Sequence, residues 1–111
     1  MRRDFKVYLE DMLRACEKVR LYTEGKSLDD FASDEKTMDA VVRNLEILGE
    51  ASKQIPESIR EANPGVEWSK ISGLRDILIH HYFGIDVVIV WDVVQNKVPA
   101  LISRITKILS D

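Results

Sequence analysis

Apolar residues recur at alternating steps of three and four along most of this chain, and this spacing places them on one face of an α-helix. The first such stretch holds Phe5, Leu9, Met12, Cys16 and Val19. It predicts a helix from about residue 3 to residue 23, which Gly25 ends. A period near 3.6 residues, rather than 2, therefore favours an all-α fold.

The second periodic stretch starts near Ser33 or Asp34 and runs to about Ile55, where Pro56 prevents the helix from continuing. Its inward face is predicted to hold Met38, Val41, Val42, Leu45, Leu48, Ser52 and Ile55. The preceding segment, SLDDF, predicts a short turn with Ser27 as its N-cap. The following segment, PESIREANPGVEW, predicts a connector with one helical turn.

A third helix is predicted over residues 68–83 and ends at Gly84, and Asp86 caps a fourth helix. The fourth helix carries the stripe Val87, Trp91, Val94, Val98, Leu101, Ile105 and Ile108. Pro99 falls within this stripe without shifting its phase, which predicts one kinked helix. A break at Asn96 is the alternative.

These four helices and their short connections predict an antiparallel four-helix bundle that forms a single domain over residues 1–111. A hydrophobic content of 45% suffices for one modest core in a chain of 111 residues. A net charge of −3 argues against sequence-blind binding to duplex DNA or to an anionic membrane, although a local basic groove could still bind RNA.

The expected location is the cytoplasm. The lone cysteine, Cys16, can form neither an internal disulfide nor a cysteine-based zinc site, which favours a reducing compartment. No apolar run follows the N-terminal MRRDFKVYLEDM, so no signal peptide is expected. The most apolar stretch, IDVVIVWDVV, is too short to span a bilayer.

Both histidines lie in one stretch, LRDILIHHYFGID, at residues 74–86. On a helix that turns ~100° per residue, the core face would hold Ile71, Leu74 and Leu78. His81 would border that face, whereas His80 would point the opposite way together with Asp76. Two adjacent histidines diverge by ~100° and cannot both face one ion, so no metal site is expected.

The outer face of this third helix also carries large apolar residues, because Ile79 and Phe83 lie near His80. A helix that is apolar on both sides is buried on both sides, which in a small protein predicts a subunit interface. Arg75 would lie between the two faces, almost in line with Tyr82. A twofold axis would bring two copies of His80 and Arg75 into a shared cleft.

These residue types suit the cleavage of RNA without a metal ion, by attack of the ribose 2′-hydroxyl on the adjacent phosphate. An imidazole such as His80 can take or give a proton near neutral pH. The Arg75 guanidinium can stabilise charge on a phosphoryl oxygen, and Asp76, four residues before His80, can hold the imidazole tautomer. A structural role fits the same residues, with one histidine packed, one solvated and Arg75 in a surface ion pair, and spacing alone favours it.

The stretch RDILIHHY, from Arg75 to Tyr82, resembles the RxxxxHxY motif of the HEPN superfamily, in particular the HepT-like toxins. Three other stretches resemble segments of that family in the expected order: AVVRNLEILGEASKQIP, the tryptophan-containing WSKISGLRD and VWDVVQNKVPAL. The resemblance covers almost the whole chain.

The resemblance implies a HEPN-type helical bundle that dimerises through the motif-bearing helix, as a homodimer or a higher even oligomer. It implies a metal-independent endoribonuclease toxin of a type VII-like toxin–antitoxin module, with no cofactor. Arg75 and His80 would be catalytic, Asp76 auxiliary, and Tyr82 the site of AMP addition. The cognate partner would be a minimal nucleotidyltransferase antitoxin.

Two other functions fit the same sequence. One is a non-catalytic HEPN binding module that forms a complex with a minimal nucleotidyltransferase or presents substrate to it. The other is a structural helical dimer without a chemical role. Detectable RNA cleavage would exclude both.

Overall fold

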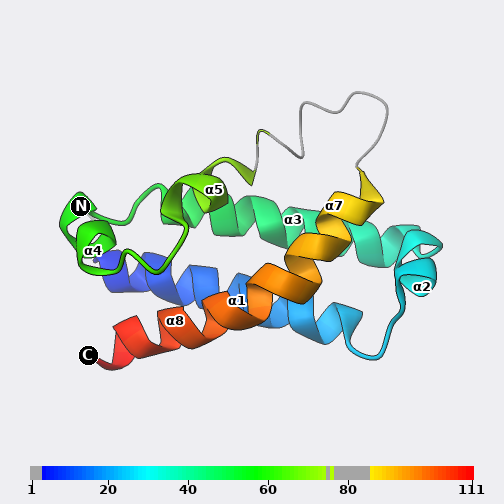
Figure 1. Ribbon diagram of the computed structural model, residues 1–111, viewed down its shortest axis with the longest axis horizontal. Helices are drawn as coiled ribbons and strands as arrows, with labels where there is room; N and C mark the ends of the chain where they lie inside the picture. Colours follow the sequence, from blue (N-terminus) through cyan, green and yellow to red (C-terminus); the bar gives the residue numbers. More distant parts are fainter. Residues whose placement is uncertain (1–3, 75, 77–85) are drawn as a thin grey trace.

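The computed structural model describes residues 4–74, 76 and 86–111, and the elements that these residues form are helices (Figure 1). In chain order they are α1 (Phe5–Thr23), α2 (Leu28–Ala32), α3 (Glu35–Ser52), α4 (Glu57–Ala62), α5 (Trp68–Ser72), α7 (Val87–Asp92), the π-helix η1 (Val93–Lys97) and α8 (Val98–Ser110). The all-α prediction is confirmed, and the two predicted connectors contain the short helices α2 and α4.

The core lies between α1, α3 and α8. Figure 1 shows α1 and α3 side by side and antiparallel, with α8 along the other side of α1. The predicted stripes form this core, with the buried residues Leu9, Met12, Cys16 and Val19 from α1, Val41, Leu45 and Leu48 from α3, and Val98, Leu101 and Ile105 from α8. Helix α2 adds the fully buried Phe31, whose ring centroid lies 5.2 Å from that of Trp91 in α7.

The last helical stretch is continuous but irregular, because η1 joins α7 to α8 immediately before Pro99. The Val98 N–H donates to the Val93 carbonyl, five residues back, which is the wide turn of a π-helix. A regular helix would need an N–H at residue 99 and would press the proline ring against the carbonyl of residue 95. Figure 1 shows the axis turning between α7 and α8, so the predicted kink occurs as a π turn rather than as a break at Asn96.

The helix starts follow local capping chemistry. Asp34 caps α3, because its carboxylate accepts from the Thr37 N–H at 3.1 Å. Ser27 and Asp30 form a reciprocal capping box at the start of α2. Asp86 caps α7 as predicted, and its carboxylate accepts from the Val88 N–H at 3.0 Å.

Helix α3 ends at Ser52, three residues before the predicted end. Pro56 supplies the physical reason, because it has no N–H to donate to the Ser52 carbonyl four residues back and its ring would press against that carbonyl. The Arg60 side chain then occupies the carbonyl end of α3. Its guanidinium donates to the Lys53 carbonyl at 3.1 Å and to the Ile55 carbonyl at 3.0 Å. These bonds satisfy carbonyls that have no partner within the helix, and they place a positive charge at its C-terminus.

Candidate functional site

The prediction of one continuous third helix over residues 68–83 is wrong, because α5 ends at Ser72 and Gly73 forms its C-cap in a turn. Three of the four predicted site residues, Arg75, His80 and Tyr82, lie outside the described residues. The fourth, Asp76, is exposed to solvent. The described residues on either side of this segment define where the chain enters and leaves it.

The chain just before the motif segment, defined as residues 75–85, is held in place by two hydrogen bonds. Trp68, 7% exposed, donates from its indole nitrogen to the Asn63 carbonyl at 3.0 Å. Ser72, the last residue of α5, shares a hydrogen bond of 2.8 Å with Ser52, the fully buried last residue of α3. The first contact ties α5 to the end of α4 and the second ties it to α3, shortly before Arg75 in the sequence.

Glu67 joins α5 to the π-helix. Its carboxylate lies 2.8 Å from the Lys70 ammonium and 3.2 Å from that of Lys97, thirty residues further along the chain. The hydrogen bond and charge of Lys70, and then those of Lys97, lower the pKa of Glu67. The hydrogen bond to Glu67 in turn raises the pKa of Lys70.

A groove of about 650 Å³, here named the α5–α8 groove, separates α5 from η1 and α8. Its floor is apolar and includes Leu48, Val66, Ile71, Leu74, Val98 and Leu101. Its rim carries Lys70, Lys97 and Arg104 as well as Glu67. The Arg104 guanidinium lies directly over Gly65, at the position that a Cβ of residue 65 would occupy.

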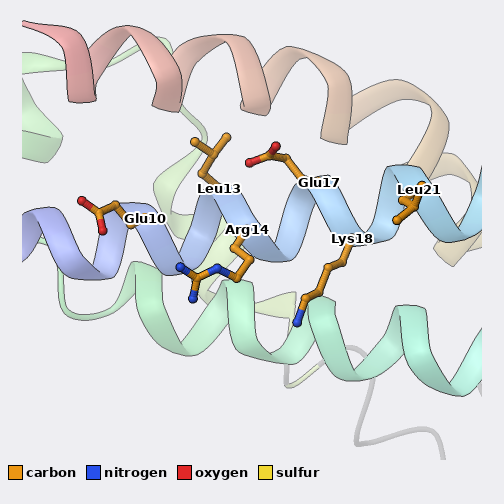
Figure 2. A pocket seen from close by; sticks show the side chains of 6 residues that line it. All are labelled: Glu10, Leu13, Arg14, Glu17, Lys18 and Leu21. Carbon is orange, nitrogen blue, oxygen red and sulfur yellow. The ribbon is translucent and has the colours of Figure 1, made fainter.

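Charge distinguishes this groove from two other hollows of the described surface. The hollow on the outer face of α1 carries Glu10, Glu17, Arg14 and Lys18, which sum to zero. Figure 2 shows its two cations on one side of α1, with Leu13 and Glu17 on the other. The hollow between α1 and α3 carries Asp11, Glu46, Glu50 and Arg43, and is net negative. Among the three, the α5–α8 groove is the positive one, with three cations and one carboxylate.

The exit from the motif segment exposes apolar surface. Directly after the Asp86 cap, Val88 is 60% exposed and Ile89 is 42% exposed. Exposed apolar residues mark a contact surface where they form part of a larger contiguous patch. They lie next to the segment for which the sequence predicts a subunit interface.

Sequence reasoning did not single out Lys97 and Arg104. The available signal was their spacing, because residues seven apart lie on one face of a helix. No helix of the described residues is long and apolar enough to cross a membrane. Within the same residues, no group of three or more histidine, cysteine or acidic side chains is placed to hold a metal ion.

Comparison with known proteins gives a family match over residues 12–108, to the family described as "Ribonuclease HepT-like". "Putative RNase MJ0127" of Methanocaldococcus jannaschii is 43% identical over 99% of this chain and 91% of its own length. "Probable ribonuclease HepT" of Thermococcus cleftensis is 42% identical over 97% of this chain and 98% of its own length. No solved structure was found to match the chain.

Proposed function

This chain belongs to the ribonuclease HepT-like family, and on that premise we propose that it is a metal-independent endoribonuclease that acts as the toxin of a toxin–antitoxin module. The observation that carries the proposal is the Arg75–His80 motif inside the matched region, residues 12–108. Relatives about 40% identical over nearly the whole chain bear ribonuclease names, which supports an RNA substrate.

In the proposed reaction, the ribose 2′-hydroxyl attacks the adjacent phosphorus. His80 accepts the 2′-hydroxyl proton, a new oxygen–phosphorus bond closes a 2′,3′-cyclic phosphate, and the bond to the 5′-oxygen breaks. The leaving 5′-oxygen takes up a proton, so one strand ends in the cyclic phosphate and the other in a 5′-hydroxyl. Arg75 stabilises the charge on the phosphoryl oxygens, and Asp76 orients the imidazole.

The proposed active unit is a homodimer in which the motif-bearing helices meet. The exposed Val88 and Ile89 support this arrangement, because they extend the apolar surface beside the motif segment. The proposal predicts that Val88→Glu weakens association, as measured by sedimentation equilibrium. Leu21→Glu is the control, since Leu21 is similarly exposed, at 65%, on α1.

The proposed regulation is AMP addition to Tyr82 by a cognate minimal nucleotidyltransferase. Because Tyr82 is seven residues after Arg75, a helix would bring the added phosphates near that guanidinium and occupy it. Mass spectrometry after incubation with the partner and ATP should show added AMP units. Tyr82→Phe should remain unmodified and fully toxic, and a variant that is still modified would exclude this role for Tyr82.

RNA cleavage in EDTA tests the catalytic assignment. His80→Ala and Arg75→Ala should each abolish cleavage and relieve growth inhibition while retaining the far-UV circular dichroism of the native chain. His81→Gln is the matched control, since it changes the neighbouring imidazole and should retain cleavage. If both motif variants still cleave RNA, the site is wrongly assigned. If the native protein cleaves no RNA but binds a nucleotidyltransferase, it is instead a binding module.

A further inference from the structure

We propose that the α5–α8 groove holds single-stranded RNA next to the cleavage site, with Lys97 and Arg104 contacting backbone phosphates. This inference rests on the proposed ribonuclease function and assigns these two residues to substrate positioning. It concerns the strand outside the scissile bond, whereas Arg75 and His80 would act at the bond itself.

The charge of the groove supports an anionic occupant. The chain as a whole carries −3, yet the described residues that line this groove have two more positive charges than negative ones. The two other hollows described above are neutral or negative. A polyanion approaching the described surface would therefore be attracted to the α5–α8 groove and repelled by the hollow between α1 and α3.

The geometry of the rim also favours phosphate binding. Glu67 holds the ammonium groups of Lys70 and Lys97 at 2.8 and 3.2 Å, so a single carboxylate positions both lysines. Arg104 lies across the Gly65 backbone and forms no ion pair with any described residue. Its guanidinium is therefore available for the bidentate contact to phosphate that arginine favours.

The position of the groove connects it to the predicted catalytic residues. Gly73 lines the groove, and His80 follows it by seven residues. Leu74 also lines the groove, and Arg75 of the motif follows it directly in the sequence. A strand bound at the motif would enter the groove beside Leu74, with its bases toward the apolar floor and its phosphates at the rim.

Fluorescence anisotropy with a labelled 2′-O-methyl oligouridine of about 12 nucleotides tests the proposal, because this RNA lacks the attacking hydroxyl and stays intact. Arg104→Gln and Lys97→Gln should each weaken binding several-fold. Each should also reduce the slope of log Kd against log salt by about 0.7, the value for one lost contact to single-stranded RNA.

Lys18→Gln is the matched control, because it makes the same change in net charge within the neutral hollow on α1 (Figure 2). It should leave both the affinity and the salt slope near their native values. If Arg104→Gln and Lys97→Gln behave like Lys18→Gln, the groove does not bind RNA. If they weaken self-association instead of RNA binding, the groove is a protein contact and the proposal is wrong.

Cleavage of unmodified RNA separates this inference from the proposed function. Cleavage by the native protein, combined with unchanged RNA binding in the groove variants, would overturn the groove assignment alone. Absence of cleavage by the native protein would overturn the ribonuclease proposal, on which the groove assignment rests.

Discussion

The hydrogen bond between Ser52 and Ser72 should stabilise the fold, and its contribution to the free energy of unfolding can be measured by comparing the two single variants with the double variant. Each hydroxyl carries one hydrogen. Ser52 donates its hydrogen to the Gly49 carbonyl at 2.7 Å, so Ser72 must donate to Ser52 across the 2.8 Å contact. Ser52→Ala therefore removes two hydrogen bonds, whereas Ser72→Ala removes one.

We expect Ser72→Ala to lower the free energy of unfolding by about 1 kcal/mol in the native chain, the typical net value of one hydrogen bond. In a Ser52→Ala background the same substitution should cost almost nothing, because its acceptor is already absent. The double-mutant cycle should thus give a coupling of about 1 kcal/mol. Urea unfolding followed by circular dichroism measures all four proteins.

Ser69→Ala is the control, since Ser69 is exposed on the same helix and should change stability little. A coupling below about 0.3 kcal/mol, the scatter expected for independent sites, would show that the Ser52–Ser72 hydrogen bond does not contribute to stability.

Three further predictions follow from single side chains. Glu67→Gln should be less stable than the native chain near neutral pH. Because the folded pKa of Glu67 lies below its ordinary 4.5, that difference should vanish in urea titrations as the pH falls through the folded value. Arg60→Ala should lose about 1–2 kcal/mol of unfolding free energy in urea, because carbonyls at the end of α3 lose a charged donor, and Arg60→Lys should recover part of it. The Cys16 thiol, whose pKa burial raises to about 12, should resist iodoacetamide in the native protein; fast alkylation without denaturant would contradict its burial.

The locally encoded features of the fold were predictable from the sequence. The apolar period placed Leu9, Leu45 and Leu101 in the core, and each is buried. Capping chemistry likewise located the helix start at Asp86, and of the two predicted starts for the second helix, Ser33 and Asp34, the structure has Asp34 as the N-cap. These features depend on neighbours within one or two helical turns, so the order of residues is sufficient to predict them.

The irregular helix ends were less accessible to sequence reasoning. Pro99 indicated a kink, but the local sequence did not show that it would take the form of a π turn between the buried Val94 and Val98. Arg60 follows Pro56 in the sequence, yet its guanidinium donates to the Lys53 carbonyl at the end of α3. The apolar period of α3 could not indicate this contact. In both cases packing between elements decided among conformations that the local sequence allowed.

The sequence by itself determined the helical class, the core stripes and the motif from Arg75 to Tyr82. Only the tertiary structure brought Glu67 to Lys97, thirty residues away, and laid Arg104 over Gly65. The physical reason is that a groove belongs to no single helix: its charge is the sum over side chains that packing brings together. The net negative chain therefore carries a positive groove, and no stretch of its sequence shows one.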